Sequence, residues 1–311
     1  MSEDRPQLPS PAPATGRGRT ALVFGGSGQI GAPLLARLAG LGWDIHALSR
    51  DPRPPQPRVR WLRGELAQPG TLPAAVDAVL SCGPLDAFSV WFERGDVSCR
   101  RVLAFGSTSV DIKQASADAA ERDVARRLRE AEARLFDAAA KRGVDATVLR
   151  PTLVYGAGRD ATLTRIAGLA RLLHGFALPS DADGRRQPAH VDDLADAAIA
   201  CLDATATHGR AYALPGGETL PYREMVARVL AALPSRPRLW MLPPPLFRAL
   251  LAPARLLGVA AGFNDAALAR MRDDLVFDDA PARRDFGYAP RPFAPTAAML
   301  TPPAADPPAS R

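Results

Sequence analysis

The sequence is poor in the residues that mark metal, disulfide and nucleic-acid-binding proteins. Its three cysteines, Cys82, Cys99 and Cys201, are scattered over 311 residues without metal or disulfide spacing. We therefore expect small buried side chains, no metal site and a reducing, cytoplasmic location. The net charge of +6 comes without zinc-finger spacing or an RNP-like aromatic motif, so we expect no nucleic-acid partner.

Long apolar runs are also missing, and none approaches the length of a membrane span. The stretch "PLFRALLAPARLLGVAAG" could lie on a membrane surface, but its prolines favour packing over a substrate cleft. We therefore expect no stable membrane insertion. Residues 1–18 lack the apolar segment of a signal peptide and, like residues 299–311, are expected to be disordered.

Between these ends, strand and helix patterns alternate. "TALVFGGSGQIGAPLLARLAGLGWDIHALSR" predicts strand, helix and strand, which requires a right-handed crossover and a parallel sheet. "VRWLRGEL" predicts a third strand, "TLPAAVDAVL" a helix leading to a fourth, and "RRVLAF" a fifth. A short helix over "LDAFSVWFERG" precedes the fifth strand. A long helix over 115–142 then leads to a sixth strand in "DATVLRPTLVYG".

This order predicts an α/β fold, a doubly wound parallel Rossmann sheet with a smaller C-terminal α+β substrate domain. We expect residues 19–178 to form the Rossmann domain, with residues 188–205 packing back onto it. The smaller region should then occupy residues 179–298.

A glycine motif, "GGSGQIG", stands directly between the first strand and its helix. Gly25 suits the tight turn, Gly28 the close approach of a pyrophosphate, and Gly31 the packing of the helix on the sheet. The helix N-terminus adds partial positive charge for the phosphates. The motif predicts a dinucleotide site whose loop also includes Ser27, Gln29 and Ile30.

The end of the second strand favours NADP over NAD, although NAD is possible. Ser49 and Arg50 stand where an acidic residue would bind the ribose hydroxyl of NAD. A hydroxyl and a guanidinium suit a 2′-phosphate instead. Glu65 and Leu66 follow the third strand, where an adenine ring would lie, and Pro151 completes the predicted cofactor residues.

With these motifs, the chain resembles the extended and atypical short-chain dehydrogenases/reductases, which include nucleotide-sugar epimerases and dehydratases. The resemblance covers about residues 20–295 and includes "FGGSGQIG", "GSTSV", "LRPTLVYG", "QPAHVDDLADA" and "DFGYAPRPF". It implies an NAD(P)-binding Rossmann fold and a small-molecule substrate. A homodimer is possible.

The resemblance also implies a catalytic Ser or Thr, followed by a Tyr-x-x-x-Lys pair on the next helix. Ser107 and Thr108 supply the hydroxyls, but no tyrosine in the sequence is followed by lysine four residues later. Alignment on Glu132 places Val124 at the Tyr position and Leu128 at the Lys position. The polar pair is therefore absent.

Other groups could handle a proton. Lys113 follows the hydroxyl loop and Tyr155 ends the sixth strand, although a solvated loop and a cleft wall are the more ordinary roles for them. We expect His190 to bond nearby backbone and Asp192 and Asp193 to cap a helix.

Two functions stay open. One is an NADP-dependent oxidoreductase or epimerase/dehydratase-like enzyme for a small carbonyl, hydroxyl or sugar-nucleotide substrate. The alternative is a non-catalytic NADP(H)-binding redox sensor or assembly factor.

Overall fold

A seven-stranded parallel sheet forms the centre of the protein in the computed structural model, which describes residues 18–256 and 265–303. The strand order is β11-β6-β5-β4-β1-β2-β3, with the topological switch between β1 and β4. The strands are β1 (Thr20–Phe24), β2 (Asp44–Ser49), β3 (Val59–Arg63), β4 (Ala78–Ser81), β5 (Arg101–Phe105), β6 (Asp145–Pro151) and β11 (Arg210–Leu214). The predicted doubly wound α/β fold is confirmed.

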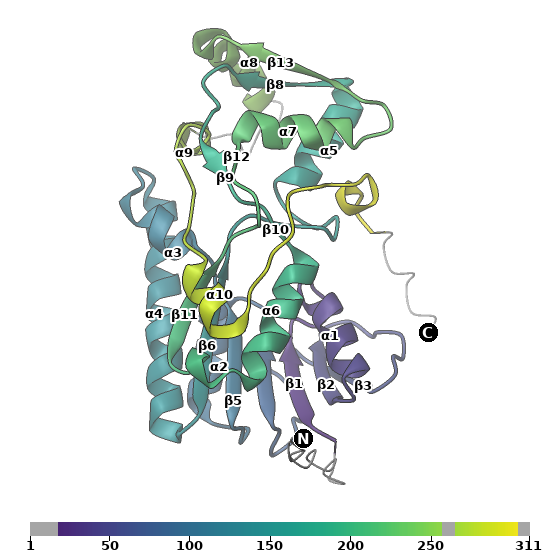
Figure 1. Ribbon diagram of the computed structural model, residues 1–311, viewed down its shortest axis with the longest axis vertical. Coiled ribbons are helices and arrows are strands. Elements are labelled where there is room, and N and C mark those ends of the chain that lie inside the picture. Colours follow the sequence, from purple (N-terminus) through teal and green to yellow (C-terminus); the bar gives the residue numbers. More distant parts are fainter. Residues whose placement is uncertain (1–17, 257–264, 304–311) are drawn as a thin grey trace, which may run out of the picture.

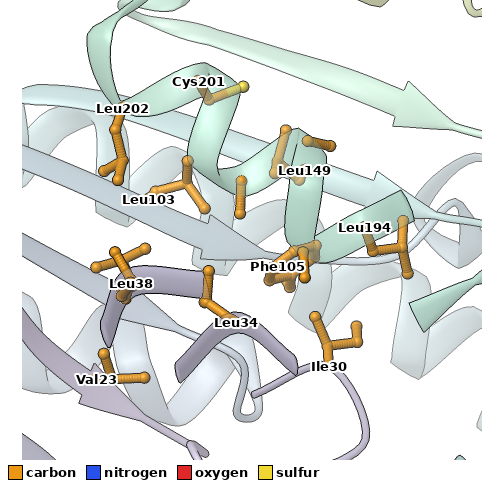
Figure 2. Packing of buried hydrophobic residues seen from close by; sticks show 14 of the residues in the cluster. Val23, Ile30, Leu34, Leu38, Leu103, Phe105, Leu149, Leu194, Cys201 and Leu202 are labelled. Atoms are coloured by element: carbon orange, nitrogen blue, oxygen red, sulfur yellow. The ribbon is translucent and has the colours of Figure 1, made fainter. Parts of the chain in front are cut away.

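Helices cover both faces of the sheet (Figure 1). On one face lie α1 (Gly31–Gly40) and α6 (Val191–Asp203), and on the other lie α2 (Leu85–Arg94) and α4 (Ala119–Arg142). Figure 2 shows Leu34 of α1 and Leu194 of α6 packed near Phe105 of the sheet. The central strands are buried on both faces, and for this reason their sequences are continuous apolar runs.

One predicted helix is wrong. The segment 71–80, expected to be helical, runs as loop and turn and then enters β4 at Ala78. Val79 and Leu80 are fully buried strand residues, so the apolar run marks the strand itself. The long helix also starts later than expected, because α3 (Ser109–Ile112) and a 3-10 turn (Lys113–Ala115) precede it, and Asp118 caps α4 through the Ala120 N–H.

A smaller region packs around a second hydrophobic cluster. It contains α5 (Leu163–Leu173), β8 (Gly175–Pro179), β9 (Arg185–Arg186), β12 (Leu220–Pro221), α7 (Tyr222–Ala231), β13 (Arg238–Leu242), α8 (Pro244–Leu256) and α9 (Asp265–Arg270). The short strands β7 (Val154–Tyr155) and β10 (Ala189–His190) pair with each other in parallel. We expected residues 179–298 to form this region, but β11 joins the central sheet and α10 (Ala280–Phe286) packs beside it.

The C-terminal end differs from expectation in part. Residues 299–303 were expected to be disordered, yet Leu300 is fully buried in the second cluster and ends a 3-10 turn (Ala298–Leu300). The remaining expected arms, residues 1–17 and 304–311, lie outside the described residues, as do residues 257–262 of the apolar stretch. No helix in the described part of the chain is long and apolar enough to cross a membrane.

Candidate functional site

The glycine loop after β1 is built by close backbone contacts. Gly25 has φ +70°, and its carbonyl accepts the Gly28 N–H at 2.9 Å. A Cβ on Gly31 would lie 2.1 Å from the Gly25 oxygen, and one on Gly25 would lie 2.8 Å from the backbone of Cys82 and Gly83. The loop therefore requires glycine at both positions, because any side chain would push apart the strand, the turn and the helix.

The first turn of α1 is suited to an anion. It contains no acidic residue, and the side chain of its N-cap residue, Ile30, makes no capping hydrogen bond. The positive end of the helix dipole is therefore not offset by a local carboxylate. Backbone N–H groups at such a terminus bind phosphate groups.

A groove of about 500 Å³ runs along the carboxyl ends of β1, β2, β3 and β4. This is the crevice in which ligands of open α/β sheets bind. The predicted cofactor residues that line it are Gly25, Ser27, Gly28, Ser49, Arg50, Glu65 and Leu66.

The other predicted cofactor residues lie beside the groove. Gln29 lines a neighbouring cleft, while Ile30 is buried in the core beneath α1. Pro151 ends β6, and its carbonyl accepts bonds from the Thr108 N–H and hydroxyl. Cys82 lines the groove wall, where burial raises the pKa of its thiol to about 12, so it stays protonated and unreactive at neutral pH.

The end of β2 supplies positive charge at one end of the groove. Arg50 is exposed and lines it. Ser49 is buried; its hydroxyl donates to the Asp51 carbonyl at 2.8 Å and accepts from the Arg53 guanidinium at 3.2 Å. The end of β2 therefore places the guanidinium of Arg50 in the groove lining, with Arg53 bonded to Ser49 beside it.

The hydroxyl loop follows β5. Thr108 is buried and bonds to the Pro151 carbonyl at 3.2 Å, so its hydroxyl ties the ends of β5 and β6 together. Ser107 is half-buried, and its oxygen accepts the Ser109 N–H at 3.1 Å. That bond does not use the Ser107 proton, which can still be donated to a substrate oxygen. Lys113 stands half-buried in the 3-10 turn beyond this loop.

Helix α4 presents apolar residues where the resemblance requires the polar pair. Val124 is half-buried, and Leu128 packs against the core between the sheet and α2. The next polar residue on this face is Glu132, which is buried and ion-paired with Arg150 of β6. Arg150 also lies 3.6 Å from Asp111. The Arg150 guanidinium therefore pairs with two carboxylates and links α4 and α3 to β6.

Tyr155 and His190 pack edge to face with 5.0 Å between ring centroids. Burial raises the pKa of Tyr155, which is 1% exposed, and makes its phenol a weaker acid. His190 accepts the Asp192 N–H at 3.1 Å and caps α6, which confirms the expected backbone bond. The predicted capping by Asp192 and Asp193 is wrong.

The two aspartates in fact form ion pairs. Asp192 lies 3.2 Å from Arg37 of α1, and Asp193 lies 2.7 Å from Arg291. Because His190 already caps the helix, these carboxylates in the first turn tie α6 to α1 and to the C-terminal segment.

A second cavity, of about 230 Å³, lies in the smaller region, and no sequence motif predicted it. Its cationic walls come from α5, β9 and α9, and Leu153 next to the end of β6 also lines it. The lining residues that carry polar groups are Thr162, Arg165, Arg186, Tyr222 and Arg270. These arginines lie far apart in the sequence, so no local spacing identifies them.

Two of the arginines are held in place differently. The Arg186 guanidinium donates to the carbonyls of Arg185 and Asp273, each at 2.8 Å, and burial lowers its pKa. Arg270 forms an ion pair with Glu121 of α4, and Ser116 donates to the same carboxylate at 2.8 Å. The Glu121–Arg270 pair therefore joins the smaller region to the helix that carries Val124.

Comparison with known proteins decides the family. The sequence pattern of the NAD dependent epimerase/dehydratase family matches residues 125–214. The chain is 31% identical over 221 residues to the (4-alkanoyl-5-oxo-2,5-dihydrofuran-3-yl)methyl phosphate reductase of Streptomyces griseus subsp. griseus, an alignment covering 68% of this chain and 73% of the reductase. The chain belongs to the NAD dependent epimerase/dehydratase family.

Two further similarities agree with this family. The UDP-glucose 4-epimerase of Vibrio cholerae is 28% identical over 164 residues, which are 52% of this chain and 47% of the epimerase. The aligned chain thus spans about half the length of that relative. Among solved structures, MoeE5 in complex with UDP-glucuronic acid and NAD superposes with a TM-score of 0.64 at 18% identity, covering 88% of this chain and 94% of that one. At that identity it supports the fold alone.

A nicotinamide dinucleotide is the cofactor of the NAD dependent epimerase/dehydratase family. The residues that line the groove of this protein fit such a cofactor. The glycine loop leaves no room for a Cβ at Gly31, and no acidic residue in the first turn of α1 offsets the positive end of the helix dipole. Gly28, which lies in this loop just before α1, also lines the groove. Gln29 and Ile30 would hold the pyrophosphate through their N–H groups, while Gly28, whose own N–H is bonded to the Gly25 carbonyl, lets it approach the loop closely. Glu65 and Leu66 would border the adenine.

Proposed function

We propose that the protein is an NADP-dependent oxidoreductase or epimerase/dehydratase-like enzyme. Its substrate would be a small carbonyl, hydroxyl or sugar-nucleotide compound, and it would work without the usual Tyr–Lys pair. The observation that carries the proposal is the glycine cradle opening into a groove that ends at Arg50. Arg50, with Arg53 bonded to Ser49, offers planar donors to a 2′-phosphate.

Ser107 is the residue we place at the substrate oxygen. The bound cofactor supplies or accepts a hydride at C4 of its nicotinamide ring. Ser107 would donate its uncommitted proton to the substrate oxygen, while Thr108 fixes the loop through the Pro151 carbonyl. Positioning of the reactants then supplies most of the rate enhancement, because the facing residues of α4 are apolar.

Lys113 and Tyr155 are the other candidates for handling a proton. Lys113 is half-buried in the 3-10 turn that follows the hydroxyl loop. Tyr155 is the weaker candidate, because it is 1% exposed and its pKa is raised by burial. A water molecule or the substrate itself would otherwise complete the proton transfer.

The arginine-lined cavity supports a substrate that carries an anionic group. Arg165, Arg186 and Arg270 converge there, and Arg forks match phosphate and carboxylate oxygens. The names of two relatives, a methyl phosphate reductase and a UDP-glucose epimerase, both describe phosphate-bearing substrates. We propose that the phosphate or carboxylate of the substrate binds in this cavity while its carbonyl or hydroxyl faces Ser107.

A second function is favoured by one observation. Val124 and Leu128 are apolar residues at the positions that alignment on Glu132 assigns to the Tyr–Lys pair, as suits a non-catalytic NADP(H)-binding sensor or assembly factor. Titration with NADPH and NADH, followed by turnover on carbonyl and sugar-nucleotide panels with and without phosphate, separates the two. Phosphate-dependent turnover supports the enzyme, whereas tight NADPH binding with no oxidation on any substrate supports the sensor.

A further inference from the structure

An arginine from a distant loop touches the glycine loop. Arg159 lies between β7 and α5, and its guanidinium donates to the Ser27 carbonyl at 2.5 Å across a separation of 132 residues. Ser27 belongs to the turn that would surround the pyrophosphate. Arg159 is exposed, so burial does not fix its side chain, and this contact brings its charge to the site.

The backbone on both sides of Arg159 is fixed. Asp160 accepts the N–H groups of Thr162 and Thr164, each at 3.1 Å, and so anchors the start of α5. Gly158 has φ +64°, and its N–H donates to the Met299 carbonyl at 2.9 Å. The loop therefore presents Arg159 from a rigid base.

The C-terminal strap, residues 298–302, forms part of that base. A Cβ on Gly158 would lie 2.0 Å from the Thr301 carbonyl oxygen, so strap and loop touch backbone to backbone. Arg171 of α5 donates to the Leu300 carbonyl at 3.2 Å and to the Thr301 hydroxyl at 3.1 Å. Figure 1 shows this yellow segment running from α10 past β10 to the level of α5.

A cleft of about 380 Å³ lies next to Arg159, and Gly28 lines both this cleft and the cofactor groove. Gln29 lines the cleft too, and its side-chain oxygen is buried without a hydrogen-bond partner among the described residues. A guanidinium and an unused acceptor therefore meet at the positive end of α1. A phosphate needs donors and a neighbouring ribose hydroxyl needs an acceptor, so the two groups together suit a ribosyl phosphate.

We propose that Arg159 binds the pyrophosphate of the dinucleotide and that the C-terminal strap positions it there. This inference rests on the proposed cofactor. On binding, the Arg159 guanidinium exchanges the neutral Ser27 carbonyl for charged phosphate oxygens, which are stronger acceptors. The strap makes no contact of its own with the cofactor in this scheme; it acts through Gly158, and Arg171 is a positioning residue.

Equilibrium binding tests the proposal without any substrate. The Kd values of NADPH and NADH are measured by fluorescence for the wild type and for Arg159→Gln, Arg159→Lys, Arg171→Gln and the Arg159→Gln/Arg171→Gln double variant. We expect Arg159→Gln to weaken both dinucleotides about tenfold and Arg159→Lys to recover part of the loss. Arg171→Gln should cost about threefold, and the double variant should bind no worse than Arg159→Gln.

Two controls separate a pyrophosphate contact from a general charge effect. Adenosine 2′-monophosphate, which lacks the pyrophosphate, should bind Arg159→Gln as it binds the wild type. Arg100→Gln removes an exposed charge directly before β5, at the amino ends of the parallel strands and so away from the groove, and should leave every Kd unchanged. Because Arg159 and Arg100 are both exposed, these variants should fold normally.

Four results would overturn parts of the scheme. Wild-type affinity of Arg159→Gln for NADPH would remove Arg159 from the site, as would equal weakening of adenosine 2′-monophosphate. Additive losses in the double variant would show that the strap does not act through Arg159. A wild-type protein that binds neither dinucleotide would instead overturn the cofactor proposal itself.

Discussion

The cofactor groove and the arginine-lined cavity are formed by different parts of the chain's chemistry, one by its backbone and the other by its side chains. The cofactor side depends on backbone geometry, with glycines packed so closely that a Cβ on Gly31 would sit 2.1 Å from a carbonyl oxygen. The arginine-lined side depends on side chains from three distant segments, held by bonds such as Glu121–Arg270. The glycine positions of the loop tolerate no side chain, whereas single substitutions can change the charge of the arginine-lined cavity one residue at a time.

The largest effect is expected at the glycine cradle. Gly31→Val would drive two methyl groups into the Gly25 carbonyl, separating α1 from the loop and weakening NADPH binding by about a hundredfold or more. Gly40→Val is the matched control, because a Cβ at that position would meet no atom within 4 Å. Fluorescence titration with thermal melting measures both variants. Tight NADPH binding by a folded Gly31→Val protein would contradict the cradle.

The second effect concerns the link between α4 and α9. Glu121→Gln or Arg270→Gln leaves one partner charged in a largely buried place and should lower the free energy of unfolding by about 3 kcal/mol. The double variant should lose less than the sum, as interacting partners do. Urea unfolding measures these values. Fully additive losses would show that the pair contributes no coupling across the cleft.

The third effect tests how Arg50 selects the cofactor. Arg50→Glu should raise the Kd of NADPH about thirtyfold while changing that of NADH by about threefold or less, because the new carboxylate repels a 2′-phosphate and can accept from a 2′-hydroxyl. Arg100→Glu gives the same charge change at the amino ends of the parallel strands, away from the groove. If Arg50→Glu weakened the binding of NADPH and NADH equally, Arg50 would not be the residue that distinguishes the 2′-phosphate from the 2′-hydroxyl.

The smallest effect is expected in the hydroxyl loop. Ser107→Ala should lower kcat about tenfold and leave the Kd of NADPH unchanged, since only the bond to the substrate oxygen is removed. Thr108→Ala should cost about 1 kcal/mol of stability through the lost bond to Pro151. Steady-state kinetics on whichever substrate turns over measures the first. Unchanged kcat in Ser107→Ala would remove the serine from the mechanism.

Local patterns predicted most of the central domain. The glycine spacing after β1 and the leucines at helical spacing in α1 depend only on short-range geometry, which is the same wherever such a pattern occurs. The helix expected over 71–80 failed because a short apolar run reads equally as a buried strand or a buried helix. Here Val79 and Leu80 are strand residues with neighbours on both faces.

The boundaries in the second half were harder to predict. β11 lies 59 residues beyond the end of β6 yet pairs with it, since Arg210 aligns with Thr147 in the sheet. Between the two strands the chain forms α5 and β8 in the smaller region and α6 on one face of the central sheet. No local pattern states which sheet a strand joins, because pairing depends on which edge is free when the chain returns.

The sequence by itself determined the glycine loop, the charge at the end of β2 and the absence of any Tyr-x-x-x-Lys spacing. These features reside in neighbouring residues, whose geometry the chain fixes locally. Only the tertiary structure brought Arg165, Arg186 and Arg270 around one cavity and placed Arg159 against Ser27. Such contacts join segments that are far apart in the chain, and their positions follow from how the helices and strands pack.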